Sequence, residues 1–189
     1  MKREVEILAE VFDTKKAALR KLKGLTFQGN KKTLDVYFFD PKRKDLQPDK
    51  RGQLKQCLRV RSKDGKASVA YKVDHFDTKG VWLYSDEYET AVENFLKTEE
   101  IFKKLGLKEL VRIENTKSTF VNDIYEVVLE DVKGLGLFME VERHNVGARE
   151  NIVKVKKEIV DWIQKMGIRV SAELTMGKPE LMLRKKKEK

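Results

Sequence analysis

Residues 134–142 read Gly-Leu-Gly-Leu-Phe-Met-Glu-Val-Glu, a turn followed by a segment in which Glu140 and Glu142 flank Val141. Residues two apart in an extended chain point to the same side, so both carboxylates share one face and the valine lies on the other. The opening of the chain, Glu-Val-Glu-Ile at residues 4–7, repeats this arrangement. Both segments predict strands with one charged face and one apolar face.

Two further segments of the chain have the same property. Glu87 and Glu89 share a face, whereas Arg59 and Arg61 make a basic pair, with Lys72 available on the strand after it. Any one pair could face solvent, as alternating charges on strands usually do. Their recurrence on separate segments with apolar alternates favours a closed barrel, in which helices cover an apolar outer face and the inner face is wet and charged.

A charged interior is costly unless counter-charges fill it, because unpaired buried ions are strongly destabilising. Carboxylates hold divalent cations through hard oxygen ligands, and arginines grip phosphate oxygens with bidentate geometry. A metal-bound polyphosphate meets both demands. Catalysis on such a ligand would come from positioning and charge stabilisation.

The chain as a whole fits an α+β domain of about eight strands with flanking helices. The expected strands are residues 4–12, 33–39, 56–62, 68–73, 84–90, 110–115, 118–129 with a turn near 122–123, and 137–143. The expected helices are residues 15–23, 93–105 and 152–166. The polar stretch 41–53 predicts a mobile loop.

Composition limits the class of protein. With 189 residues, 38% of them charged, the chain predicts a single soluble domain, and it contains no apolar run long enough for a membrane span and no signal segment. We therefore expect a cytoplasmic location. Cys57 is the only cysteine, which excludes an intrachain disulfide. The net charge of +10 favours a polyanionic partner, and residues 183–189 predict a basic disordered tail.

The charged segments occur in an order that resembles the CYTH superfamily, also called triphosphate tunnel metalloenzymes. The segments that carry the resemblance are Glu4-Val5-Glu6-Ile7, Asp35-Val36-Tyr37-Phe38, Leu58-Arg59-Val60-Arg61, Ala70-Tyr71-Lys72, Glu87-Tyr88-Glu89 and residues 134–142. The last is most similar to class IV adenylate cyclases and their archaeal relatives. The resemblance covers roughly residues 1–182, which we expect to form one CYTH domain.

The resemblance implies an eight-stranded antiparallel tunnel, dependence on Mg²⁺ or Mn²⁺, and substrates such as ATP, thiamine triphosphate or inorganic triphosphate. The metal-binding positions it implies are Glu4, Glu6, Glu130, Glu140 and Glu142. The substrate-binding positions are Arg59, Arg61, Lys72, Lys117, Glu87 and Glu89, and the catalytic ones are Glu4, Glu6 and Lys72.

The sequence also departs from the family pattern. The lysine that should close the ExExK opening is Leu8, and the arginine expected two residues before Glu87 is Ser85. A tyrosine expected before Glu180 is also absent, and Lys178 is followed there by proline. If the missing lysine and arginine balance phosphate charge or orient the attacking group, their loss lowers turnover more than binding.

Three functions follow as hypotheses. The first is a metal-dependent enzyme that hydrolyses a triphosphate or, like a class IV adenylate cyclase, converts ATP to cyclic AMP and pyrophosphate. The second is a polyphosphate or nucleotide sensor with weakened catalysis. The third is a basic nucleic-acid-binding module, which the net charge permits but the interleaved acidic pairs oppose. The sequence is compatible with either a monomer or a homodimer.

Overall fold

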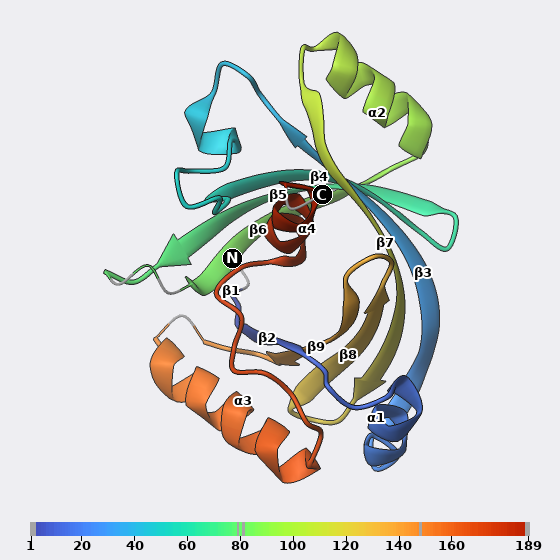
Figure 1. Cartoon of the computed structure of the whole chain (residues 1–189), viewed down its shortest axis with the longest axis vertical. Coiled ribbons are helices and arrows are strands. Elements are labelled where there is room, and N and C mark those ends of the chain that lie inside the picture. Colours follow the sequence, from blue (N-terminus) through green and yellow to red (C-terminus); the bar gives the residue numbers. More distant parts are fainter. Residues whose placement is uncertain (1–2, 79, 81, 148, 188–189) are drawn as a thin grey trace.

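A strongly curved antiparallel sheet forms the body of the protein in the computed structural model, which describes residues 3–78, 80, 82–147 and 149–187, with the backbone alone at residues 3, 4 and 187 (Figure 1). Its strands are β1 (Arg3–Glu4), β2 (Glu6–Glu10), β3 (Thr26–Phe39), β4 (Gln56–Lys63), β5 (Lys66–Phe76), β6 (Trp82–Val92), β7 (Lys108–Val121), β8 (Tyr125–Val132) and β9 (Gly136–Arg143). The α-helices are α1 (Lys15–Lys21), α2 (Phe95–Lys104), α3 (Ile152–Met166) and α4 (Lys178–Lys187), and a 3₁₀-helix spans Lys44–Leu46.

The N-terminal segment joins the two edges of the sheet. The strand order is β1-β6-β5-β4-β3-β7-β8-β9-β2, so β1 and β2 are the outermost strands. Only Val5 separates them along the chain, and they pair antiparallel with β6 and β9 respectively. Residues 3–10 therefore act as one strand, which gives the eight-stranded antiparallel barrel of an α+β fold that the sequence predicts. The seam between β1 and β6 is short, with two residue pairs.

The apolar residues that alternate with the charged ones face outward under helices, as predicted. Val5, Ile7 and Val141 pack in one buried cluster with Val155 and Ile159 of α3. Helix α2 covers a second outer cluster on β3 and β4, formed by Val36, Phe38 and Val60 with Phe95 and Phe102. Because a strand that buries its apolar side under a helix turns its other side inward, this packing orients the charged side chains toward the barrel interior.

One end of the barrel interior is apolar, which the sequence did not predict. The interior apolar cluster consists of Leu8, Tyr37, Val111, Ile113, Val132 and Phe138. Leu8 lies directly opposite Glu140, and Tyr37 directly opposite Arg59, so these apolar residues share the inner face with the charged ones. The interior is thus divided into a charged part and an apolar end.

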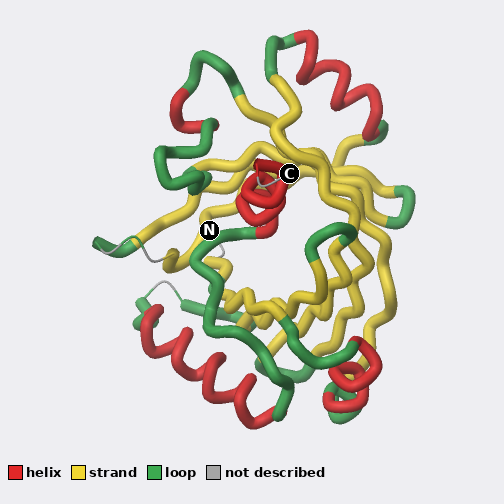
Figure 2. The backbone as a smooth tube through the Cα atoms, viewed as in Figure 1, coloured by secondary structure: helices red, strands yellow, loops and turns green. Residues whose placement is uncertain are grey.

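Helix α4 covers this apolar end, and it lies inside the opening of the curved sheet (Figure 2). Leu181, Met182 and Leu183 pack against the interior apolar cluster. The chain is therefore helical through Lys187, where the sequence predicted a disordered tail from residue 183. Residues 188–189 lie outside the described part. The apolar contacts explain the difference, because they anchor a helix that its basic composition alone does not favour.

Several strands are longer than the sequence predicts, and β3 and β7 extend furthest beyond their predicted ranges. The break expected between residues 115 and 118 is absent, because Thr116 and Lys117 pair with β3 on one side and with β8 on the other. Strand β3 begins at Thr26 although its first half is polar, because that half pairs with the end of β7. The helix predicted at 152–166 is confirmed. Among the described residues, no helix is long and apolar enough to span a membrane.

The packing of α3 on the sheet can be tested with two residues of the same helix. Ile159 is fully buried, whereas Val153 is 69% exposed. Ile159→Ala should lower the free energy of unfolding by about 2–5 kcal/mol, because it leaves a cavity in the core. Val153→Ala should change it by less than about 0.5 kcal/mol. Urea unfolding followed by circular dichroism measures both, and equal effects would contradict this orientation of α3.

Candidate functional site

The barrel interior contains a cavity of about 280 Å³. The predicted site residues that line it are Glu6, Arg59, Arg61, Lys72, Glu87, Glu89, Lys117 and Glu140, from six strands. Glu130 contacts the lysines of the same site, and Glu142 lies directly opposite Glu6. The side chain of Glu4 is outside the described residues. The structure thus brings the predicted residues together, and their individual roles stay predictions.

Strand register gathers these side chains. Lys72 lies directly opposite Glu87 across β5 and β6, and Asp35 lies directly opposite Arg61 across β3 and β4. Such cross-strand neighbours project from the same face of a sheet. A closed barrel directs that face inward, so residues far apart in the sequence meet around one cavity.

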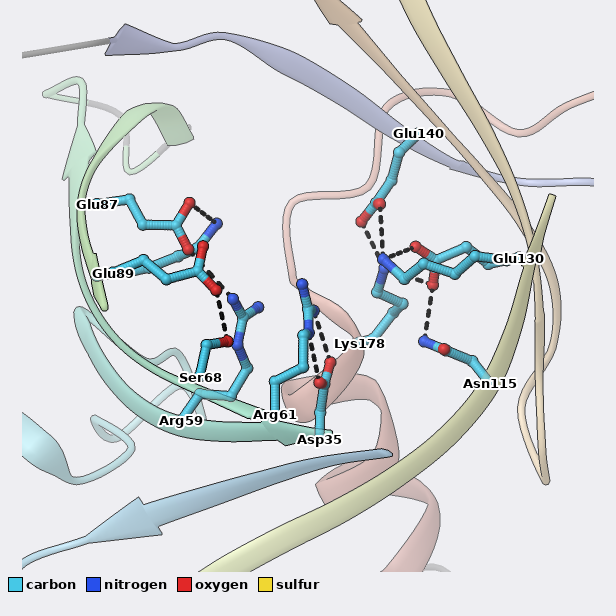
Figure 3. Close-up of polar contacts among 12 residues, drawn as sticks. Asp35, Arg59, Arg61, Ser68, Glu87, Glu89, Asn115, Glu130, Glu140 and Lys178 are labelled. Carbon is cyan, nitrogen blue, oxygen red and sulfur yellow. Dashed lines mark hydrogen bonds and ion pairs between the residues drawn. The ribbon is translucent and has the colours of Figure 1, made fainter. Parts of the chain in front are cut away.

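One side of the cavity carries the arginines (Figure 3). Arg61 donates two hydrogen bonds to Asp35, from Nε to Oδ1 at 2.7 Å and from Nη2 to Oδ2 at 2.8 Å. Burial alone would raise the pKa of Asp35, but the hydrogen bonds and charge of Arg61 hold it below its usual value. Asp35 therefore stays ionised and fixes the guanidinium in place. Asp35 belongs to one of the segments that resemble the CYTH family, but it was not predicted as a site residue.

Arg59 presents an unsatisfied donor. Its Nη2 donates to Glu87 Oε1 at 3.1 Å, and Lys72 Nζ lies 3.2 Å from Glu87 Oε2. Arg59 is only 7% exposed, and its Nε has no hydrogen-bond partner among the described residues. A buried donor without a partner costs about 1–3 kcal/mol. An oxygen of an anionic ligand in the cavity would satisfy it.

The other side of the cavity holds a cluster of two carboxylates and two lysines (Figure 3). Lys178 Nζ donates to Glu130 Oε2 at 2.8 Å and to Glu140 Oε1. Lys117 Nζ pairs with Glu130 and lies 3.6 Å from Glu140 Oε2. Asn115 Nδ2 donates to Glu130 Oε2 at 3.1 Å. Glu130 is 0% exposed, so these partners stabilise a carboxylate that water cannot reach.

The two carboxyl groups of this cluster differ in acidity. Burial and the neighbouring Glu140 carboxylate raise the pKa of Glu130. Burial would also raise the pKa of Glu140, but the charges of Lys178 and Lys117 lower it well below its ordinary value. Lys178 was not predicted as a site residue, because nothing in a local pattern places the C-terminal helix inside the barrel.

A row of carboxylates crosses three strands beside this cluster. Glu142 lies directly opposite Glu6 on β2 and directly opposite Glu126 on β8. Neighbouring like charges on one face of a sheet are destabilising, and a cation between them removes the repulsion. Glu126 was not predicted, although its spacing of four from Glu130 on one strand puts both on the same face.

The donor set suits a hard divalent cation. Among the described residues, eight carboxyl and five basic side chains line the cavity. Carboxyl groups that could bind a metal therefore outnumber the positively charged side chains. No group of three or more metal-ligating side chains forms a preformed centre in the described part of the chain. Mg²⁺ usually takes one or two carboxylates and completes its shell with water and substrate phosphates. The residues therefore fit a metal that binds together with a phosphate ligand.

Glu180 lines the cavity and connects α4 to the loop before β4. Its Oε1 accepts a hydrogen bond from the backbone N–H of Leu54 at 3.1 Å. Glu180 is 5% exposed, and burial raises its pKa to about 7. The carboxyl group is therefore partly protonated at neutral pH.

Comparisons with known proteins agree with the fold. The CYTH domain family model matches residues 2–172. A Methanocaldococcus jannaschii protein named "Putative adenylate cyclase MJ0240" is 32% identical over 161 residues, which cover 83% of this chain and 87% of that protein.

Two solved structures share the fold. The PH1819 protein from Pyrococcus horikoshii OT3 has a TM-score of 0.79 at 24% identity, over 96% of this chain and 99% of that one. An adenylyl cyclase candidate from Hippeastrum, HpAC1, described as having a dominant triphosphatase activity, has a TM-score of 0.65 at 14% identity, over 97% of this chain and 96% of that one. At these identities the likeness shows the fold.

The raised pKa of Glu180 predicts a pH-dependent stability. The folded protein binds the Glu180 proton more tightly than the unfolded chain, whose ordinary pKa is 4.5. This stabilisation is complete below pH 4.5 and is lost as the pH rises to about 7. Relative to Glu180→Gln, the wild-type free energy of unfolding should therefore fall by up to about 3 kcal/mol across that window. Urea unfolding at a series of pH values measures it.

The matched control is Glu100→Gln, which changes an exposed carboxyl group on α2. Its stability should follow the wild-type pH dependence. If the curves of wild type and Glu180→Gln are parallel between pH 4.5 and 7, the Glu180 carboxyl group does not carry this proton.

Proposed function

Because the chain belongs to the CYTH domain family, we propose that it is a divalent-metal-dependent enzyme that processes a triphosphate in the barrel cavity. The observation that carries the proposal is the buried guanidinium of Arg59, whose Nε lacks a partner among the described residues and which faces the carboxylate cluster across the cavity. Such a donor needs an anionic oxygen, and the neighbouring carboxylates of Glu6, Glu142 and Glu126 beside that cluster favour a cation.

Arg59, Arg61 and Lys72 would bind the phosphate oxygens. Arg61 donates to Asp35 from Nε and Nη2. The N–H groups on Nη1 of Arg61 can therefore donate to a ligand. Glu87 contacts both Arg59 and Lys72 and keeps their charges on one side of the cavity. A phosphate chain bound there would be oriented by fixed donors, and positioning of this kind supplies much of the catalysis in phosphoryl transfer.

We propose Glu4, Glu6, Glu140 and Glu142 as the carboxylates that would hold Mg²⁺ or Mn²⁺. Glu130, which was also predicted as a metal ligand, is fully buried and bound by Lys117 and Lys178, so we propose that it positions those lysines. A bound divalent cation neutralises phosphate charge and makes an attacking oxygen more acidic. Glu4, Glu6 and Lys72 are the candidate catalytic residues. The carboxylates would place the attacking oxygen, and the Lys72 ammonium would stabilise charge that develops on the phosphate.

Two reactions suit this arrangement. In cyclisation the ribose 3′-oxygen of ATP attacks the α-phosphorus and pyrophosphate leaves, giving cyclic AMP. In hydrolysis water attacks the terminal phosphorus of ATP, thiamine triphosphate or inorganic triphosphate, the bond to the bridging oxygen breaks, orthophosphate forms and the diphosphate leaves. The name of the M. jannaschii relative favours the first reaction, and the description of the Hippeastrum neighbour includes the second.

A second candidate is a triphosphate sensor with weakened turnover. It is favoured by Ser85, which stands where the family pattern has an arginine. Ser85 is buried, accepts a hydrogen bond from Trp82 Nε1 at 3.2 Å and donates to Asp74 at 2.5 Å. This corner of the cavity thus has a hydroxyl group in place of a cation. Nucleic acid fits less well, because Arg59 and Arg61 lie inside the barrel.

The first test is product analysis. The purified protein is incubated with ATP, thiamine triphosphate or inorganic triphosphate, each with Mg²⁺ or Mn²⁺, and the products are separated by chromatography. We expect cyclic AMP with pyrophosphate, or orthophosphate, and loss of the product in Glu4→Ala/Glu6→Ala. Triphosphate binding without any product would favour the sensor, and neither binding nor product would refute the proposal.

The second test addresses the arginine side of the cavity. Arg59→Lys keeps the charge but loses the planar fork of donors, so it should weaken binding of inorganic triphosphate with Mg²⁺ by about 10- to 100-fold. Isothermal titration calorimetry measures the dissociation constant. The control is Arg112→Lys, because Arg112 pairs with Glu99 and Glu109, which do not line the cavity. An equal effect of both changes would contradict the assignment.

A further inference from the structure

Lys178 is a cavity residue that comes from outside the sheet. It lies at the first position of α4 and is 9% exposed. Its ammonium hydrogen-bonds with the carboxylates of Glu130 on β8 and Glu140 on β9. These two bonds use two of the three ammonium donors, and Lys178 also lines the cavity, so a third donor is available to a ligand there.

Leu8 is a neighbour of one of these two carboxylates, that of Glu140. It is directly opposite Glu140 across β2 and β9, and it lines the same cavity. A lysine at this position would project from the same face as Glu140, within reach of its carboxylate. Leucine has no charge to offer, so the ammonium that contacts Glu140 has to come from another element.

The same leucine helps to hold the segment that supplies that ammonium. Leu8 belongs to the interior apolar cluster, against which Leu174 and Leu181 pack. The backbone N–H of Leu174 donates to the carbonyl oxygen of Leu8 at 2.8 Å. Leu174 and Leu181 lie on either side of Lys178 in the chain. The apolar side chain at position 8 therefore stabilises the placement of the C-terminal lysine.

We propose that Lys178 is a further ligand-binding lysine of the site, and that α4 delivers to Glu130 and Glu140 the ammonium that strand β2 lacks at Leu8. The ammonium neutralises the carboxylate cluster and offers its remaining donor to a phosphate oxygen of the ligand. Helix α4 is then part of the binding site as well as a cover for the apolar end. This inference rests on the proposed function for its ligand, but the relocation of the charge can be tested without it.

A purely structural ion pair predicts a different outcome. Removal of Lys178 would then lower stability without a specific effect on triphosphate binding, and a lysine at position 8 would only disturb the interior apolar cluster. Under the proposal, the two positions are interchangeable sources of one charge. The decisive variant is therefore Leu8→Lys/Lys178→Met, compared with Lys178→Met alone.

Binding of inorganic triphosphate with Mg²⁺ by calorimetry is the first measurement. Loss of one charge-assisted contact in Lys178→Met should weaken binding by about 10- to 100-fold. The double variant should recover to within about threefold of wild type. The control is Lys185→Met, an exposed lysine of the same helix, which should bind like wild type. Wild-type affinity in Lys178→Met, or no recovery in a folded double variant, would overturn the proposal.

Thermal unfolding is the second measurement, and it separates this proposal from the proposed function. Lys178→Met leaves Glu130 and Glu140 with Lys117 as their remaining lysine partner among the described residues, so its Tm should fall and the double variant should regain it. If wild type binds no triphosphate, the proposed function fails, but recovery of Tm still supports the relocated charge. If Lys178→Met alone does not fold, recovery of a folded protein in Leu8→Lys/Lys178→Met supports the relocated charge. No gain in Tm or in folded protein from Leu8→Lys in the Lys178→Met background would overturn it.

Discussion

The fold depends on ion pairs that form across strands inside a closed barrel. Carboxylates and guanidinium groups lose hydration when they are buried, and only well-placed partners offset that cost. The register of β3 and β4 supplies such a partner by setting Asp35 opposite Arg61, and the register of β7 and β8 sets Lys117 opposite Glu130. A shift of register by one residue would turn these charged side chains to the other face of the sheet, so the charge pairing inside the barrel and the register of its strands depend on each other.

Helix α4 extends this constraint to the C-terminus. Its apolar residues cover the interior apolar cluster, while Lys178 at its start reaches the carboxylates next to that cluster. An ammonium group cannot be placed so accurately by an exposed tail, because the entropy of a free side chain and chain end opposes it. The apolar end of the barrel therefore has an electrostatic role, in that it fixes the position of a charge.

Local alternation of charged and apolar residues was enough to predict the strands around the cavity and the paired charged side chains that line it. Glu140 and Glu142 are an example, since period two alone puts them on one face. Features that depend on distant partners were not predictable in this way. The polar first half of β3 is a strand because β7 extends beside it, and Lys178 meets Glu130 across 48 residues of sequence. Leu8 was recognised as a departure, but its contact with Leu174 became visible only in the folded chain.

Charge balance links the two sides of the cavity to the need for a metal. Among the described residues, carboxyl groups outnumber basic groups in the lining, so a triphosphate that entered alone would meet net repulsion from the carboxylate side. The arginines are already engaged with Asp35 and Glu87, which lowers the positive charge they can offer. Divalent cations that accompany the phosphates reverse this balance, because they attract the carboxylates and the ligand at once. The acidic excess, which would prevent anion binding in a simple basic pocket, thus becomes the reason for binding a metal complex.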